Sequence, residues 1–598
     1  MDDPSRAPEM SRRRLRLVAC PLLLAALIPA CGRAGDEPAP RSALLITLDT
    51  TRADALGCYG RSPSVTPHLD RLAEESLVFA RAHTVTPITL PSHASMMTGL
   101  TPPRHTVREN GVSPVPQSAR TLAERAREAD IQTAAFIAAA VLDSSFGLDQ
   151  GFEQYDAPAQ RGITSDAHFS AREAREVVEG ALAWLAARDR ERPFFLWVHL
   201  FDPHAPYSPP AEFTTGAASG NAYLGEVASM DDQLGRLLDA LRSEGALSET
   251  TVLVVADHGE AFGEHQEYSH ATYCYESTLH VPFLLRLPDG RRAGERSDGI
   301  VSVVDVHPTL IDALGLEAES APGGLDGLSL FHADPPSGRG VYFESYNGFY
   351  YYGWSPIAGW LDRQAKYVHS SRPQLFDLGA DPDEAHDLLA SGVREVAPYR
   401  AEIARAVGLP ALDPGQEDAL DDELLARIRA LGYVGAGAEE ADEWPHPLAP
   451  CELPGPAETA PLHRKLMSGE ARMNAGAWRE AATLFGEVLA ANPENSYARN
   501  MLGSCLIQSK RYAEAVPVFQ RLLRDGRTGA SMHYNLGISL MEVGRTAEAI
   551  VPLREAHGLA PSRAPILRYL IDCLGREGRS AEADEFRARL ERLDPAPR

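Results

Sequence analysis

The chain has 598 residues and a formal net charge of −26, from 57 basic and 83 acidic side chains. A hydrophobic fraction of 44% and a charged fraction of 23% are typical of a globular protein and exclude a disordered chain, a collagen and a multi-span membrane protein. Because nucleic-acid binders neutralise phosphates with Lys and Arg, the acidic balance predicts no nucleic-acid partner.

Residues 1–31 predict an export signal. Arginines at positions 12 to 14 precede an apolar run of about 13 residues, which is too short to span a bilayer. The run ends in Leu27-Ile28-Pro29-Ala30-Cys31. This ending is similar to a bacterial lipobox, which implies lipidation at Cys31; a plain secretory signal or a short anchor is the alternative. We expect residues 32–41 to be a tether, and the protein to be exported to the bacterial cell envelope, either free in the periplasm or held to a membrane by the lipid alone.

Residues 42–435 predict an α/β domain with a mainly parallel sheet. Apolar runs alternate with helical patterns, as in βαβ units, and the apolar runs have the continuous character of strands buried on both faces. The expected strands are residues 43–48, 194–201 and 251–256, and the expected helices lie near residues 119–129, 171–188 and 228–243.

Polar side chains follow each of these three strands. Asp49 follows the first, Asp202 and His204 the second, and Asp257 with His258 the third. Ligands bind beyond the carboxyl ends of strands in open α/β sheets, and neighbouring carboxylates and imidazoles need a cation between them. Their oxygen and nitrogen ligands suit one divalent ion: Zn²⁺, Mn²⁺, Mg²⁺ or Ca²⁺.

The alternative is that Asp49 and Asp257 cap helices, as Asp commonly does. Three such strand ends favour a site over three unrelated caps. If both residues are metal ligands, we expect their carboxyl groups to lie within about 5 Å of each other.

Thr89 is the candidate nucleophile. It stands just before Pro91 and Ser92, which can start a helix, so its hydroxyl would lie at the positive end of the helix dipole. A metal beside it would lower the pKa of the hydroxyl further and activate it for attack. The alternative is a Thr that only caps the helix.

Five segments resemble, in order, the sulfatase family of the alkaline phosphatase superfamily. They read LLITLDTTRADALGCYG, TLPSHASMMTGL, FFLWVHLFDPHAPY, VVADHGEAFGEH and YESTLHVPFLL. The resemblance spans about residues 42–390. It implies an alkaline-phosphatase-like α/β sandwich around a metal-centred site, and a hydrolase of sulfuric or phosphoric esters that binds an anionic ester.

The chain departs from the sulfatase motifs at several positions. Sulfatases have Cys-x-Pro-Ser-Arg, whose Cys becomes formylglycine; here Thr89 replaces that Cys and His93 replaces the Arg. Thr50 stands where the family usually has a second Asp, His258 where it often has Asn, and His270 where a sulfate-binding Lys often lies. His204, of the Asp-Pro-His motif, is retained.

The remaining set resembles the one-metal site of phosphate- and phosphonate-ester relatives and of phosphotransferases with a Thr nucleophile. That resemblance implies that Asp49, Thr89, Asp257 and His258 hold the metal and that Thr89 attacks the ester. His204 or His270 would protonate the leaving oxygen. His93 and Asn110 are candidate substrate contacts, although Asn110 could instead be a turn residue.

The chemistry of Thr favours a phosphoester or phosphodiester substrate. A formylglycine hydrate expels sulfate by collapsing to the aldehyde, whereas a Thr ester must be attacked at sulfur or phosphorus, a step that phosphoryl chemistry manages routinely. A sulfate ester stays open, as do transfer to an acceptor hydroxyl and a degenerate enzyme domain whose repeats bind a partner.

The C-terminal part repeats with a period of 34 residues. A Glu-Ala pair recurs at residues 480, 514, 548 and 582. This period resembles the tetratricopeptide repeat, so residues 463–598 predict four stacked helix pairs that bind an unidentified protein partner. Residues 436–462 are rich in Pro, Ala and Glu and predict a linker, so we expect the repeats not to complete the enzyme core.

Overall fold

The computed structural model describes residues 41–158, 172–317, 321, 323–393, 395–415, 444–526, 529–561 and 563–593. The predicted signal peptide, the lipidation site at Cys31 and nearly all of the predicted tether lie outside these residues, as does the part of the predicted linker before residue 444. Among the residues that the structure describes, no helix combines the length and apolar character needed to cross a membrane.

A nine-stranded sheet forms the centre of the catalytic part, and its order is β4-β3-β5-β1-β6-β8-β2-β7, with β9 paired to β2. The pairings of β1 with β5 and β6, and of β3 with β4 and β5, are parallel, so the predicted mainly parallel sheet is confirmed. The strands are β1 (Ser42–Leu48), β2 (Leu77–His83), β3 (Gln132–Phe136), β4 (Gln154–Asp156), β5 (Phe194–Leu200), β6 (Thr250–Ala256), β7 (His280–Val281), β8 (Phe283–Arg286) and β9 (Arg296–Ser302).

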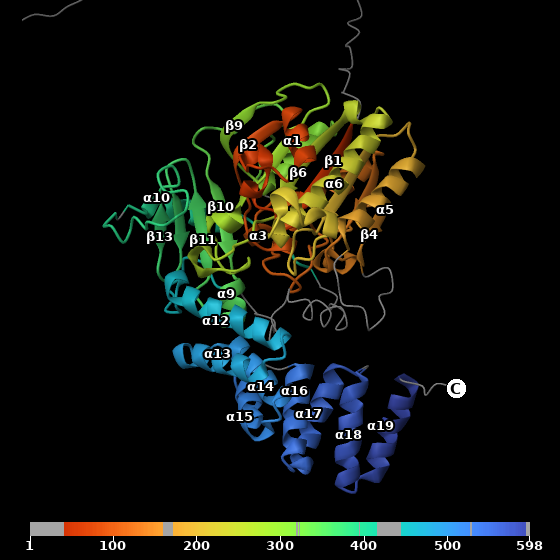
Figure 1. Ribbon diagram of the computed structural model, residues 1–598, viewed down its shortest axis with the longest axis vertical. Coiled ribbons are helices and arrows are strands. Elements are labelled where there is room, and N and C mark those ends of the chain that lie inside the picture. The colour runs from red at the N-terminus through yellow and green to blue at the C-terminus, as the bar shows by residue number, and fades with distance from the viewer. Residues whose placement is uncertain are drawn as a thin grey trace, which may run out of the picture. The chain divides into compact units, whose positions relative to one another are not determined.

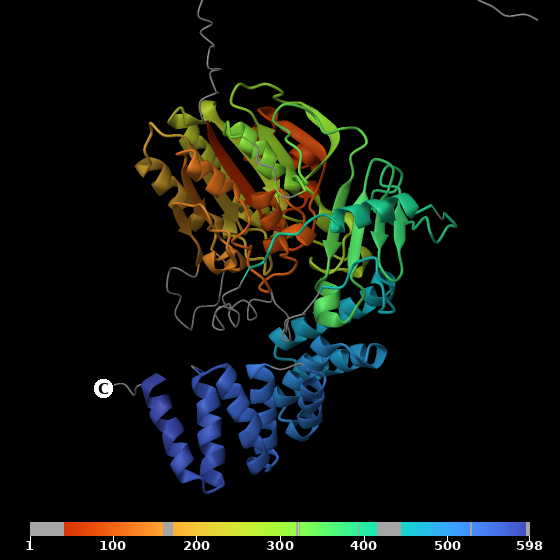
Figure 2. The same cartoon turned by 180° about the vertical axis from the view of Figure 1, so that it is seen from behind.

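Two groups of helices pack on this sheet (Figures 1 and 2). One group is α1 (Pro67–Glu74), α5 (Ala174–Ala187) and α6 (Ala222–Ser243), in which α6 contacts the other two. The other is α2 (Thr89–Thr98), α4 (Leu122–Glu128) and α8 (Val306–Ala313), which contact one another. Strands β1, β5 and β6 are buried along their whole length, except for an intermediate Ser42, which explains their continuous apolar sequences.

A second, antiparallel sheet has the order β10-β11-β12-β13. Its strands are β10 (Val341–Ser345), β11 (Ile357–Leu361), β12 (Lys366–His369) and β13 (Gln374–Phe376), and α10 (Ala397–Val407) packs on it. The fully buried Lys366 ties this sheet to α7 (Glu276–Leu279), because its ammonium group lies 3.0 Å from Glu276 and 2.8 Å from Glu384. Sequence analysis did not predict this sheet.

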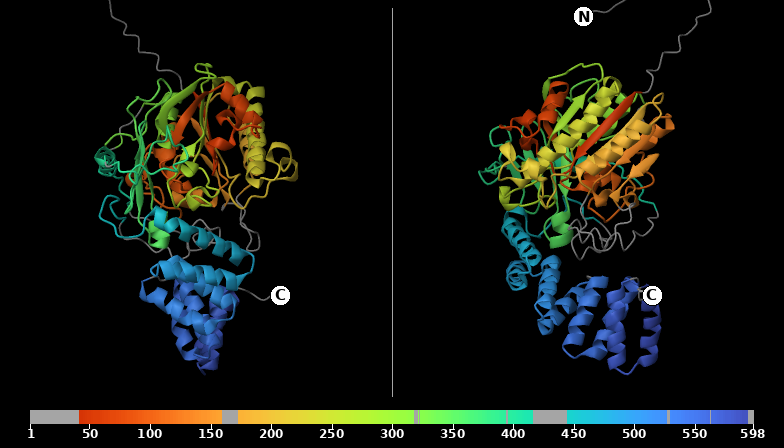
Figure 3. Two further views of the ribbon diagram at one scale, coloured as in Figure 1. Left: turned by 60° about the vertical axis from the view of Figure 1, so that its left-hand side comes forward. Right: turned by 45° about the vertical axis from the view of Figure 1, so that its right-hand side comes forward.

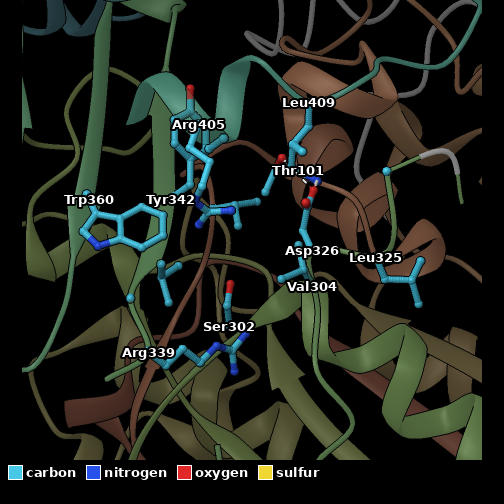
Figure 4. A pocket seen from close by; sticks show the side chains of 15 residues that line it. Thr101, Ser302, Val304, Leu325, Asp326, Arg339, Tyr342, Trp360, Arg405 and Leu409 are labelled. Atoms are coloured by element: carbon cyan, nitrogen blue, oxygen red, sulfur yellow. Dashed lines mark hydrogen bonds between the residues drawn. The ribbon is translucent and has the colours of Figure 1, made fainter. Parts of the chain in front are cut away.

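A pocket lies between α10 and the second sheet, with Tyr342, Trp360 and Arg405 among its lining residues (Figure 4). Its charged side chains are already paired: Arg339 with Asp305, Asp326 with Arg104, and Arg405 with Glu402. None of the residues that line it is one of the polar residues that follow β1, β5 and β6.

The C-terminal part is a series of helices in which each contacts the next. They are α12 (Pro456–Asn474), α13 (Trp478–Ala491), α14 (Ser496–Gln508), α15 (Tyr512–Arg524), α16 (Ala530–Glu542), α17 (Thr546–Leu559), α18 (Ala564–Arg576) and α19 (Ser580–Leu593). The 34-residue period has a packing reason. A Cβ at Gly469 would lie 2.7 Å from Phe485, and one at Gly503 would lie 2.6 Å from Phe519, so only Gly lets these helices cross so closely.

Helix α12 begins at Pro456, inside the segment expected to be a linker, and packs on the catalytic part. The Thr459 hydroxyl is 2.9 Å from the Tyr273 hydroxyl, and the ring of His463 contacts that of Tyr352. Tyr352 is the last residue of α9 (Asn347–Tyr352), which Figure 3 shows in green beside α12 in cyan. The first repeat helix therefore does complete the core of the catalytic part. The expectation was wrong because the composition of a linker carries no information about what the following helix buries.

Ending the chain at Pro450 is expected to lower its melting temperature by roughly 5 °C or more and to reduce its solubility. The truncation uncovers the aromatic rings of Tyr273, Tyr352 and Trp354, each of which packs on His463, and burying a large side chain stabilises by about 1.5–3 kcal/mol. A chain ending at Ala560 is the control, since it removes a repeat that makes none of these contacts. Equal melting temperatures for the Pro450 truncation and the full chain would contradict this expectation.

Candidate metal centre and nucleophile

Asp49, Asp257 and His258 form a compact, fully buried cluster at the ends of β1 and β6. The two strands are in register, with Leu48 opposite Ala256, so the residues that follow them emerge side by side. One ligand atom from each of the three residues lies within 4.8 Å of the others. The predicted closeness of the two carboxyl groups is confirmed.

Three of the four carboxylate oxygens of this cluster accept no hydrogen bond from the described residues. Both oxygens of Asp49 and one of Asp257 are buried without a hydrogen bond, and burial raises the pKa of Asp49 to about 7. Only the other oxygen of Asp257 is satisfied, by the backbone N–H groups of Thr50 and His258 at 3.2 and 2.7 Å. Buried carboxylates without donors are costly, and a divalent cation would relieve that cost. The donor set therefore fits a metal ion.

His258 is held in the orientation of a metal ligand. Its Nδ1 lies 3.0 Å from the carbonyl oxygen of Gly259, and because a carbonyl only accepts, Nδ1 carries the proton. The lone pair of Nε2 is thereby directed into the cluster, 3.4 Å from Asp257 and 4.0 Å from Asp49. A backbone carbonyl that fixes the imidazole tautomer in this way commonly supports a metal-binding His.

Thr89 is the first residue of α2 and is fully buried. Its hydroxyl oxygen lies 3.3 Å from Nε2 of His258, so it joins the cluster. The N-cap position is Ile88, with no side-chain cap, and Thr89 therefore does not serve as the cap. The amide of Leu90 is satisfied from outside the helix, by the side-chain oxygen of Asn110 at 2.9 Å.

His204 and His270 lie together beside the cluster. The ring centroid of His270 is 4.5 Å from that of His258 and 5.2 Å from that of His204. Nδ1 of His270 contacts one oxygen of the buried Glu260 at 3.2 Å, and the Tyr207 hydroxyl donates to the other at 3.1 Å. Burial lowers the pKa of His270 to about 4 and that of His204 to about 3, so both imidazoles are neutral in the unliganded protein.

His93 lies on the next turn of α2, below Thr89. Its Nδ1 donates to the carbonyl of Thr89 at 2.8 Å and lies 3.8 Å from Asp257. The ring is packed 5.5 Å from that of Trp197 and 4.9 Å from that of His199. All the predicted metal-binding, nucleophilic and proton-transfer residues thus lie together at this site. His93 lies within α2 and Asn110 contacts its first turn.

Residues 41–316 match the sulfatase family model, and residues 466–531 match a tetratricopeptide repeat model. The chain carries a sulfatase-family domain. The family places it among hydrolases of sulfuric or phosphoric esters. It is 25% identical over 417 residues to the uncharacterized sulfatase YidJ of Escherichia coli, covering 58% of this chain and 82% of that protein. It is also 25% identical to an arylsulfatase of Clostridium perfringens, covering 64% and 97%.

Solved structures confirm the fold of this sulfatase domain. The phosphonate monoester hydrolase of Agrobacterium radiobacter superposes with a TM-score of 0.51 at 23% identity, covering 66% of this chain and 97% of that one. At this identity the likeness concerns the architecture of the sulfatase domain.

Sequence analysis missed two residues of the sulfatase domain's site. His199 lies within β5, opposite Thr47 of β1, and its Nε2 is 3.4 Å from Asp49. Glu260 lies two residues after His258 and contacts His270. A polar residue inside an otherwise apolar strand was the available signal for His199. Glu260 had none, because its contact depends on how the loop between residues 257 and 275 folds back.

Proposed function

We propose that the protein is a metal-dependent ester hydrolase that uses Thr89 as its nucleophile, with a phosphoester or phosphodiester as substrate. The observation that carries this proposal is the Thr89 hydroxyl, buried 3.3 Å from His258 at the edge of a cluster of unpartnered carboxylate oxygens. Thr89 does not cap its helix, and this supports the nucleophile over the alternative of a capping Thr.

Asp49, Asp257, His258 and Thr89 would hold one divalent ion, which could be Ca²⁺, Mg²⁺, Mn²⁺ or Zn²⁺. When bound, such an ion lowers the pKa of a coordinated hydroxyl and offsets the charge of an anionic ester. The chain's own contribution is to keep the lone pair of His258 Nε2 facing the cluster, through the proton on Nδ1 that the Gly259 carbonyl accepts.

The reaction would proceed in two displacements. The Thr89 hydroxyl loses its proton to His204 or His270, and its oxygen forms a bond to phosphorus while the ester P–O bond breaks. The imidazolium so formed donates the proton to the leaving oxygen. Both rings lie beside His258. Water then attacks phosphorus, the phosphothreonine bond breaks and the Thr89 hydroxyl is regenerated. Glu260 keeps His270 in place through its contact with Nδ1.

Thr89 decides between phosphate and sulfate in this proposal. Thr cannot be oxidised to formylglycine, and so it cannot release sulfate by collapse to an aldehyde. His93 occupies the position of the motif's Arg and is turned toward the Thr89 carbonyl and the Trp197 ring. A sulfate ester is the alternative substrate, and transfer to an acceptor hydroxyl is the alternative second step.

A panel of p-nitrophenyl esters tests the substrate class. With each divalent metal in turn, we expect kcat/KM to be highest for the phosphate monoester or diester, and at least about tenfold lower for the sulfate, because only phosphoryl transfer suits the second displacement at Thr89. Added glycerol distinguishes hydrolysis from transfer through the products formed. Preferential cleavage of the sulfate would contradict the phosphoester assignment, and no cleavage of any ester would favour a degenerate enzyme domain.

We further propose that the protein is exported to the bacterial cell envelope and lipidated at Cys31, as the lipobox-like ending predicts. The repeat region would bind a protein partner, as stacked helical repeats commonly do on their extended surfaces.

A further inference from the structure

Five buried polar side chains link the first repeat helix to the helix that carries Thr89. They are His463, Thr272, Asn347, Glu109 and Asn110, and none is more than 8% exposed. His463 belongs to α12, Thr272 to the loop after β6, and Asn347 to the start of α9. Buried polar groups are arranged to satisfy one another, and here they form a continuous path between two parts of the chain.

With the Asn347 amide oriented as it is in the structure, the hydrogen bonds of this path run in one direction. The Thr272 hydroxyl lies 3.2 Å from the side-chain oxygen of Asn347, which only accepts, so the single proton of Thr272 is donated there. His463 Nε2, 3.2 Å from the same hydroxyl, must therefore be the donor to Thr272. The side-chain N–H of Asn347 donates onward to Glu109 at 3.3 Å.

The far end of the path sets the first turn of α2. The second oxygen of Glu109 accepts the backbone N–H of Asn110 at 3.0 Å, and the side-chain oxygen of Asn110 accepts the N–H of Leu90 at 2.9 Å. This N–H directly follows Thr89 and is one of the unpaired donors that a helix start leaves. Since Ile88 cannot cap α2, Asn110 replaces the cap and fixes where the helix begins.

The same repeat helix also holds the opposite side of the site. The loop between β6 and α7 carries His258 and His270, and near its end Thr272 and Tyr273 both contact α12. Two routes thus run from α12 to the pair of atoms whose separation matters, the Thr89 oxygen and His258 Nε2.

We propose that α12 is part of the catalytic architecture, and that His463 is a positioning residue that holds Thr89 in register with His258 through Thr272, Asn347 and Glu109. The proposal rests on the proposed function only for its turnover readout. It also means that a partner which displaces α12 when it binds the repeats would change turnover.

The test uses the full chain with His463→Leu, which removes the donor and keeps an apolar side chain in the core. We expect kcat to fall about tenfold or more, because small displacements of reacting groups are costly, with KM and metal content unchanged. Amide exchange at Leu90 should quicken, since its acceptor is loosened. His463→Gln, whose side-chain N–H can donate to Thr272, should restore most of both properties.

A double-mutant cycle with Thr272→Val tests whether the two residues act as one path. We expect the effects on kcat to be strongly non-additive, as for groups in one hydrogen-bond network. Tyr497→Phe is the matched control: it removes a partly buried hydrogen bond between α14 and Glu470 of α12 but lies outside the path. It should change neither kcat nor exchange at Leu90, whatever it does to the melting temperature.

The proposal is overturned if His463→Leu lowers the melting temperature but leaves kcat and Leu90 exchange as in the wild type, or if Tyr497→Phe matches its effects. If the wild-type chain cleaves no ester, the proposed function fails, and exchange at Leu90 still decides whether His463 positions α2.

Discussion

Thr89→Ala is expected to lower turnover by about 10⁴-fold or more while leaving the fold and the metal content largely intact. Removing a nucleophile removes the covalent route altogether, and losses of several powers of ten are typical. The fold should survive because the Thr89 hydroxyl contacts His258 and caps nothing. The measurement is the turnover of a phosphodiester, with the melting temperature and metal content taken on the same sample.

Two further variants make the Thr89 result interpretable. Thr89→Ser should keep measurable activity, because a primary hydroxyl can make the same attack. Thr98→Ala changes the same residue type in the same helix, where the hydroxyl donates to the Ala94 carbonyl at 2.7 Å and accepts the Leu100 N–H at 3.3 Å, and it should keep near-normal turnover. Near-normal turnover in Thr89→Ala would rule out the covalent mechanism and leave a water molecule as the attacking group.

The central fold and the metal cluster could be predicted because both follow from local sequence. Strands buried on two faces read as continuous apolar runs, and the polar residues that end them must meet at one edge of a parallel sheet. Asp49 and Asp257 therefore indicate the site, although they are 208 residues apart in the sequence. The repeats could also be predicted from the sequence, because the close helix packing that requires Gly at positions 469 and 503 recurs after 34 residues.

Other features could not be predicted because they depend on contacts between distant segments. The second sheet has short strands, and the ion pair of Lys366 with Glu276 that attaches it joins residues 90 positions apart. Glu260 acquires its contact only when the loop after β6 folds back on His270. The packing of α12 on Tyr273 was hidden for a similar reason, since a Pro-rich stretch predicts a boundary in the chain but not a boundary in space.

The cap of α2 shows how a local rule fails at a functional site. A Thr before a Pro-Ser pair is a reasonable N-cap, yet Thr89 lies one position inside the helix and its hydroxyl is free to face His258. Asn110 satisfies the Leu90 amide in its place. Because a remote residue, Asn110, satisfies the helix start, the Thr89 side chain does not have to cap α2. The position of the first turn of α2 then depends on Glu109 and on the residues hydrogen-bonded to it.

Asp257→Asn is expected to remove the metal and reduce turnover by more than about 100-fold. Residues that merely support metal ligands already cost 10–100-fold when changed, and Asp257 supplies one of the cluster's two carboxylates. The change is chosen to spare the fold.

The reason is that Asp257 has two separable roles. One carboxylate oxygen accepts the N–H groups of Thr50 and His258, and the other is buried without a partner. The amide of Asn keeps an acceptor for the two N–H groups and loses the negative charge that faces the cluster. Ala would break both roles at once and confuse metal loss with unfolding.

Metal content per chain, measured after dialysis, should fall to near zero while the melting temperature of the metal-free protein stays close to that of the metal-free wild type. Asp305→Asn is the control, since that buried carboxylate also accepts two backbone N–H groups, from Ser302 and Leu328, but pairs with Arg339 away from the cluster. It should lower the melting temperature without releasing metal. Full metal occupancy in Asp257→Asn would show that the cluster is not the metal site.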